Sequence, residues 1–194
     1  LYENCSATAQ GGGAYGNGSA SYKSVTNRYE SCVFSGCSAN QGGGLYANMM
    51  LMLGNRAKGG YVEGCVFTNN TAEAGGGAIF ASSGTSTAPG GMDFLNDCSF
   101  VDNKVTAGDG GAIYGSKLES ITNCRFKDNT ASNAGGAVYL GTGSEDVPLE
   151  GCSFIGNTAT SGHGGAVCAA KRIAVVTNCT FACNKAGNHG GALS

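Results

Sequence analysis

The segments FKDN (residues 126–129) and GGAVY (residues 135–139) together decide the fold of this chain. Two other clear copies of the same pair begin at Phe67 and Phe100. In a more permissive form, the pair occurs seven times in 194 residues. Self-similarity at a fixed period is typical of solenoid proteins, in which each unit packs only on its neighbours. We therefore expect one elongated domain over residues 1–194, with its function on the surface rather than in a pocket.

Most repeats open with Cys-x-Phe, and successive cysteines are 33, 33, 26, 28 and 27 residues apart. The aromatic residue and the first glycine are always 8 to 10 residues apart, whereas the rest of each repeat varies in length. One repeat then forms one coil, with a constant first arc and a second arc that carries insertions. Residues 116–122 alternate polar and apolar, and residues 172–177 are rich in β-branched side chains, so both read as strands. No segment has the apolar period of a helix, and we expect very little helix.

Alternation along these strands assigns the side chains to faces. We expect the Cys and Phe of Cys-x-Phe to point inward with the aliphatic residue that follows Gly-Gly. The Cys ladder is Cys32, Cys65, Cys98, Cys124, Cys152 and Cys179. An Asn ladder of stacked amides is expected at Asn70, Asn103, Asn129, Asn157 and Asn184. An outward, surface aromatic ladder is expected at Tyr15, Tyr46, Phe80, Tyr114 and Tyr139.

Stacked parallel coils bring like residues directly above one another, about 4.8 Å apart. These uniform columns predict an all-β fold, a right-handed single-stranded parallel β-helix of about seven coils. The sequence begins at Leu1 and stops at Ser194, both inside a repeat. We therefore expect either a segment of a longer solenoid or a unit that stacks end to end.

The pairing of Phe-x-x-Asn with Gly-Gly-Ala-aliphatic resembles the repeat of the chlamydial polymorphic outer membrane proteins. Five copies carry both halves, including residues 154–157 with 164–167 and residues 181–184 with 190–193. The first two copies depart from the pattern, because Cys5 and Cys37 replace the asparagine. The resemblance implies a surface-displayed β-helix of an autotransporter passenger region and a link to adhesion.

Composition excludes two classes of partner. Charged residues are only 12% of the chain, the net charge is −2, and the eleven Lys and Arg residues are scattered, so no basic stripe is available for nucleic acid. The longest apolar bursts, such as residues 49–53, are far shorter than the roughly 18 residues of a membrane-spanning helix. We expect no nucleic-acid partner and no membrane span in this segment.

Ten cysteines and four sequons favour an extracellular or cell-surface location. The glycosylation candidates are Asn4, Asn17, Asn69 and Asn178, although sequons also arise by chance in a chain rich in Asn, Ser and Thr. Cys5 and Cys37 occupy equivalent positions in successive coils, which predicts a disulfide between them. A link between Cys168 and Cys183 is a second candidate. The Cys ladder either pairs in register or stays as buried thiols.

No metal site, cofactor or catalytic residue is expected. The Cys spacing does not resemble a zinc motif, and the stacked His163 and His189 lack a nearby carboxylate. Acid–base catalysis needs clustered carboxylates, but the candidates do not form a column with a basic neighbour. These candidates are Asp93, Asp97, Asp102, Glu145 and Asp146.

We expect a non-enzymatic extracellular structural or adhesive protein, in its strongest variant assembled into a filament. Its partners would be copies of itself, joined end to end or laterally, or cell-surface glycans and proteins. The outward aromatic ladder offers flat faces for sugar stacking, unless the long loops at 47–64 and 81–97 cover it. A carbohydrate-active domain, acting as a lyase or hydrolase on polysaccharides, is the alternative, and an ice-binding face is a third reading.

Overall fold

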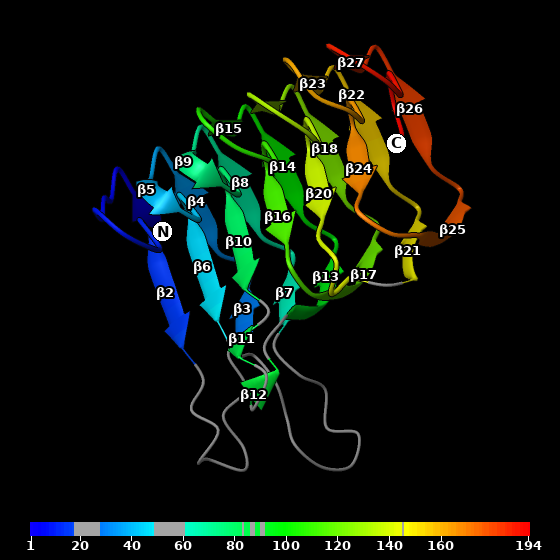
Figure 1. Cartoon of the computed structure of the whole chain (residues 1–194). Coiled ribbons are helices and arrows are strands. Elements are labelled where there is room, and N and C mark those ends of the chain that lie inside the picture. Colours follow the sequence, from blue (N-terminus) through cyan, green and yellow to red (C-terminus); the bar gives the residue numbers. More distant parts are fainter. Residues whose placement is uncertain (18–27, 49–60, 83, 86–87, 90–91, 145) are drawn as a thin grey trace, which may run out of the picture.

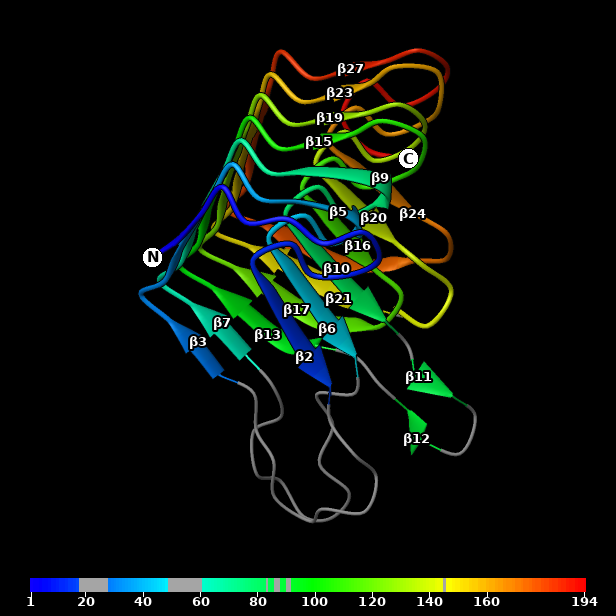
Figure 2. The same cartoon turned by 90° about the vertical axis from the view of Figure 1, so that its left-hand side faces the viewer.

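The chain forms an all-β parallel solenoid, which confirms the predicted β-helix. The computed structural model describes residues 1–17, 28–48, 61–82, 84–85, 88–89, 92–144 and 146–194. Figure 1 shows the coils side by side along one axis, and Figure 2 shows the same coils turned by 90°. No helix occurs among the described residues, as the sequence predicted. That part of the chain therefore contains no helix able to cross a membrane.

Each complete coil has four strands, and strands of successive coils pair in parallel to form four sheets. The first sheet contains β1 (Tyr2–Glu3), β4 (Val33–Ser35), β8 (Val66–Thr68), β14 (Ser99–Val101), β18 (Arg125–Lys127), β22 (Ser153–Ile155) and β26 (Thr180–Ala182). The second contains β5 (Ser38–Gln41), β9 (Thr71–Gly75), β15 (Lys104–Val105), β19 (Thr130–Ala131), β23 (Thr158–Ala159) and β27 (Lys185–Ala186).

The third and fourth sheets complete each coil. The third contains β2 (Ala14–Asn17), β6 (Leu45–Asn48), β10 (Ile79–Ser82), β16 (Ile113–Gly115), β20 (Val138–Leu140) and β24 (Val167–Ala169). The fourth contains β3 (Arg28–Glu30), β7 (Tyr61–Glu63), β13 (Met92–Asn96), β17 (Leu118–Thr122), β21 (Val147–Glu150) and β25 (Ile173–Thr177). A small antiparallel hairpin of β11 (Gly84–Thr85) and β12 (Ala88–Pro89) projects from the third coil.

Five coils are complete, beginning at β4, β8, β14, β18 and β22. A partial coil precedes them and another follows them, which corrects the expectation of about seven coils. In the first partial coil, the second-sheet position is reduced to an isolated bridge between Ser6 and Ser38. The aromatic motif marks only the first strand of a coil, so counting motifs also counts the partial coils.

The core is a stack of phenylalanine rings along the solenoid axis. Phe67, Phe100 and Phe126 lie directly above one another, with ring centroids 4.9 Å apart at both steps and ring planes within 6° of parallel. All three side chains are fully buried. The aliphatic column next to Gly-Gly is also in register and inward; for example, Ile79 pairs with Ile113. The predicted faces of both columns are therefore confirmed.

Stacked asparagines join successive coils at the turn between the first and second sheets. The Nδ2 of Asn129 donates hydrogen bonds to the Oδ1 of Asn157 and to the carbonyl of Phe100, both at 3.0 Å. Its Oδ1 accepts from the backbone N–H and the side-chain Nδ2 of Asn103, also at 3.0 Å. Every amide donor and acceptor of this buried side chain is satisfied. The same pattern links successive members of the Asn ladder at 2.9–3.1 Å.

Two different constraints select the two glycines of each pair. Gly135 has a φ of +64°, a left-handed conformation that glycine adopts at little cost. Gly136 does not, but a Cβ on it would overlap the carbonyl oxygen of Gly165 in the next coil. The first glycine thus makes the bend, and the second permits the close approach of neighbouring coils.

Turns on either side of the first sheet also use left-handed residues. The turn before each Cys of the ladder has this conformation at Ser31, Gly64, Asp97, Asn123, Gly151 and Asn178. The turn before the Asn ladder has it at Asn4, Gly36, Asn69, Asp102, Asp128, Gly156 and Cys183. Asn, Asp and Gly tolerate this region best, which explains the composition of both turns.

Replacing Asn129 with alanine should destabilise the solenoid by about 3 kcal/mol, because the buried partners of its amide lose their hydrogen bonds. Urea unfolding followed by circular dichroism measures the change. The matched control is Arg125→Ala in the same coil, whose exposed side chain should change stability by no more than about 0.5 kcal/mol. Equal effects of the two substitutions would contradict the ladder.

Candidate functional site

The predicted Cys ladder is present and buried between the fourth and first sheets. Cys65, Cys98, Cys124 and Cys152 are 1–3% exposed. The sulfur of Cys98 accepts the backbone N–H of Cys65 at 3.4 Å, and its thiol donates to the carbonyl of Asn96 at 3.1 Å. The ladder is therefore a sulfur counterpart of the Asn ladder. In the structure all ten cysteines are free thiols, as in the second of the two readings given above.

Neighbouring thiols of this ladder differ in acidity. Hydrogen bonding to Cys98, together with burial, raises the pKa of Cys65, and burial raises that of Cys124. Interaction with the thiols of Cys124 and Cys65 lowers the pKa of Cys98 below the usual value of a cysteine. The pKa of Cys152 is lowered to about 7, chiefly by the thiol of Cys124. Each of these four buried thiols also donates to the backbone carbonyl two residues before it, at 3.1–3.3 Å.

Two disulfides were predicted outside the ladder. Cys37 is fully buried, and burial raises its pKa, while the side chain of Cys5 interacts with it from the preceding coil. The Cys5–Cys37 disulfide therefore stays a prediction between neighbouring residues. Cys168 lies in β24 of the third sheet, whereas Cys183 lies in the exposed turn after β26 of the first sheet. The structure places these two thiols on different sheets and does not support a link between them.

The aromatic ladder of the third sheet stacks as predicted but is not an open surface along its whole length. The ring centroids of Tyr46 and Phe80 are 5.3 Å apart, and those of Phe80 and Tyr114 are 4.6 Å apart. Tyr15 is 49% exposed, but Tyr46 and Phe80 are only 6% and 9% exposed. Gly75 at the end of the second sheet lies against the rings of Phe80 and Tyr114. The prediction of a surface ladder is wrong at Tyr46 and Phe80. The alternation of side chains along a strand predicts which way a residue points, but not whether another segment covers it.

Most of the two loops expected to cover this ladder lies outside the described residues. The apolar burst at 49–53 also falls there. The described residues show only that the end of the second sheet contacts the aromatic rings.

The histidines and carboxylates do not form a reactive group. His163 and His189 stack, with ring centroids 5.1 Å apart. Asp97 and Asp102 occupy left-handed turns at opposite ends of β14. Asp146 binds Arg172, with Nη2 and Oδ2 2.6 Å apart, and this hydrogen bond lowers the pKa of the Asp146 carboxyl. Within the described ranges, no three His, Cys, Asp or Glu side chains are grouped as metal ligands. Glu145 and the side chain of Asp93 lie outside the described residues.

Three sequon asparagines lie at exposed turns. Asn4, Asn69 and Asn178 are all exposed and have positive φ. The side chain of Asn17 and the rest of its sequon lie outside the described residues. The geometry leaves the three exposed amides accessible, and their glycosylation stays a prediction.

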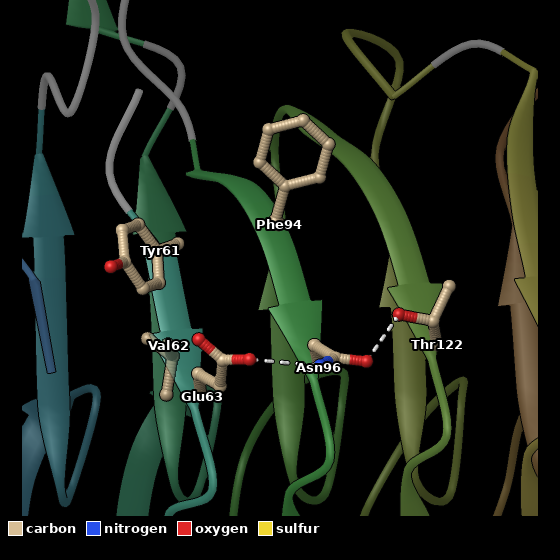
Figure 3. A pocket seen from close by; sticks show the side chains of 6 residues that line it. All are labelled: Tyr61, Val62, Glu63, Phe94, Asn96 and Thr122. Atoms are coloured by element: carbon tan, nitrogen blue, oxygen red, sulfur yellow. Dashed lines mark hydrogen bonds between the residues drawn. The ribbon is translucent and has the colours of Figure 1, made fainter. Parts of the chain in front are cut away.

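A pocket that the sequence analysis missed lies on the outer face of the fourth sheet (Figure 3). Its volume is about 240 Å³, and Tyr61, Val62, Glu63, Phe94, Asn96 and Thr122 line it. Tyr61 and Phe94 come from neighbouring coils in register and form the apolar side. Glu63, Asn96 and Thr122 form a hydrogen-bonded polar row beside them, as Figure 3 shows.

This polar row continues along the sheet as a column two residues before each ladder cysteine. Its members are Glu30, Glu63, Asn96, Thr122, Glu150 and Thr177, joined in register by strand pairing. The signal was present in the sequence, because every one of these residues is polar. The column lies just outside the Cys-x-Phe motif on which the repeats were aligned, and its residue type is not constant.

Four segments of the chain match the family model of the Chlamydia polymorphic membrane protein repeat, at residues 64–82, 97–116, 123–141 and 151–170. The chain carries polymorphic membrane protein repeats. Each matched segment starts at the left-handed turn before a ladder cysteine and ends just after a third-sheet strand. The polymorphic membrane protein repeat thus covers three sheets of a coil and omits the fourth. No solved structure matches the chain significantly.

Alkylation should separate the thiols by burial. In the folded, reduced protein, iodoacetamide should label the exposed Cys183 and leave Cys65, Cys98, Cys124 and Cys152 unlabelled. Unfolding in urea should expose all four. Peptide mass spectrometry reads the sites, and equally fast labelling of Cys183 and the four ladder thiols in the folded state would contradict the buried ladder.

Proposed function

We propose that this chain is a non-enzymatic cell-surface protein whose solenoid is a rigid scaffold for adhesion. The matching repeat family is described as one of membrane proteins, which supports a location at the cell surface. A parallel solenoid also presents long, regular outer faces to a partner.

The observation that carries this proposal is the division between constant and variable parts of each coil. The repeated Phe, Asn, Cys and Gly residues all serve stacking or turns, and the first four Asn ladder members are fully buried. The insertions and the varied side chains fall on the fourth sheet and its connections. Repetition therefore preserves the scaffold, while its outer face can change without loss of the fold.

Assembly into a filament is the second form of the proposal. The Phe and Asn ladders have a constant axial register, which stacked copies of the same repeat could continue. Electron microscopy distinguishes the two forms, because a filament shows an axial repeat close to the length of one chain.

Catalysis on polysaccharides finds less support. The three candidate carboxylates among the described residues occupy turns or bind arginine, as Asp97 and Asp102 do at opposite ends of β14 and Asp146 does with Arg172. General acid–base catalysis of glycoside cleavage needs two carboxyl groups that face the same substrate.

Beads coated with the folded chain should bind cultured epithelial cells more strongly than beads coated with the urea-unfolded chain. The folded chain should release no reducing or unsaturated ends from acidic or neutral polysaccharides. Equal binding by both bead preparations would contradict a folded adhesive scaffold. Polysaccharide cleavage that Asp97→Asn or Asp102→Asn abolishes would establish the carbohydrate-active alternative.

A further inference from the structure

We propose that the pocket on the fourth sheet binds one ring of a neutral glycan chain. This inference rests on the proposed adhesive function and names its ligand class. The pocket combines two features that suit a sugar: an apolar wall for the C–H face of a pyranose ring, and a row of planar polar groups for its hydroxyls.

The apolar wall comes from two aromatic side chains held in different ways. Phe94 is 40% exposed, which is unusual for a phenylalanine in a chain whose other phenylalanines are mostly buried. Tyr61 is fixed by its neighbours: its hydroxyl donates to Glu30 at 3.0 Å, and the guanidinium of Arg28 lies 4.6 Å from its ring centroid. Aromatic faces of this kind bury much area at small entropic cost. The Tyr61 side of the wall is therefore held in place before a ligand arrives.

The polar row is also ordered but keeps hydrogen-bonding capacity. Asn96 donates through Nδ2 to Glu63 Oε1 at 3.2 Å and accepts from Thr122 Oγ1 at 2.8 Å. Glu63 retains a second carboxylate oxygen as an acceptor, Asn96 a second N–H as a donor, and Thr122 its oxygen lone pairs. Adjacent acceptors and a donor fit the paired hydroxyls of a sugar, and the existing hydrogen bonds hold all three side chains in place.

Charge selects a neutral glycan over an acidic one. Glu30, Glu63 and Glu150 lie in the same column, and Arg28, whose guanidinium lies over the Tyr61 ring, already forms an ion pair with Glu30. A uronate or sialic acid carboxylate in the pocket would face Glu63, and none of the described residues that line the pocket is a cation, so this like-charge contact costs affinity. A basic peptide would not be repelled, and it is the competing ligand that the test must separate.

Size and direction agree with one ring of a longer chain. A volume of about 240 Å³ is below the roughly 300–1,000 Å³ of pockets for drug-sized ligands, so the site holds a small ring. The polar column continues along the solenoid axis on both sides of the pocket, from Glu30 to Thr177. Neighbouring sugar units could therefore meet further polar groups along the same face.

None of the six lining residues falls inside a segment that matches the polymorphic membrane protein repeat. The scaffold does not require Phe94 to be aromatic or Glu63 to be acidic, since their strand partners in the next coil are Ser120 and Asn96. These side chains are thus free to serve a ligand.

Isothermal titration calorimetry with cellohexaose, maltohexaose and chitohexaose tests this assignment, with oligogalacturonate and a Lys-rich peptide as the charged probes. We expect at least one neutral probe to bind and oligogalacturonate not to bind. Phe94→Ala should weaken the binding at least tenfold, Glu63→Gln should weaken it several-fold, and Phe94→Tyr should retain it. The control is Val175→Ala, which removes an apolar side chain of the same sheet that is 54% exposed and lies outside the pocket.

Circular dichroism verifies that each variant is folded. The inference is overturned if no neutral probe binds, if Phe94→Ala binds as well as the parent, or if only the Lys-rich peptide binds at the pocket.

The bead adhesion assay distinguishes a failure of the glycan pocket from a failure of the proposed adhesive function. Cell binding that survives Phe94→Ala refutes the glycan pocket as the adhesive contact and leaves the adhesive scaffold intact. Glycan binding without any cell adhesion supports the pocket and refutes the scaffold's proposed function.

Discussion

The fold depends on the close approach of successive coils at the Gly-Gly turn. At Gly136 the neighbouring carbonyl occupies the space of a side chain, so the coils can stack only where that position is glycine. The Asn ladder on the same arc then fixes the register, because each amide bonds to the coils above and below it. With the register fixed, identical side chains face each other, and the Phe rings stack with centroids 4.7–4.9 Å apart from Phe34 to Phe181.

The ladders explain how the chain separates stability from recognition. Three sheets and their turns carry the repeated residues, and they account for the buried polar and aromatic columns. The fourth sheet needs only alternating apolar residues such as Leu95 and Ile121 on its inner face. Its outer face is therefore where a ligand-binding group can vary, and the pocket around Phe94 and Glu63 lies there.

Sequence periodicity was sufficient for the solenoid, for the inward Phe and aliphatic columns and for the Asn ladder, because these residues recur at constant spacing. It did not show that Tyr46 and Phe80 are covered, since burial of an outward residue depends on contacts from another sheet. The pocket was also missed. Tyr61 and Phe94 each lie four residues before a ladder cysteine, but the residue type at this position is not repeated, since it is Ser120 in the next coil. The link between Cys168 and Cys183 stays a prediction, although these residues lie on different sheets.

Hydrogen exchange at the side-chain amides of Asn103, Asn129 and Asn157 tests in-register stacking most directly. Solvent-exposed carboxamide protons exchange rapidly, whereas protons held in a buried, fully bonded ladder exchange only when the structure opens. The account predicts slow exchange for these three amides and fast exchange for the exposed Asn178 and Asn188. Fast exchange at Asn103, Asn129 and Asn157 in the folded protein would contradict it.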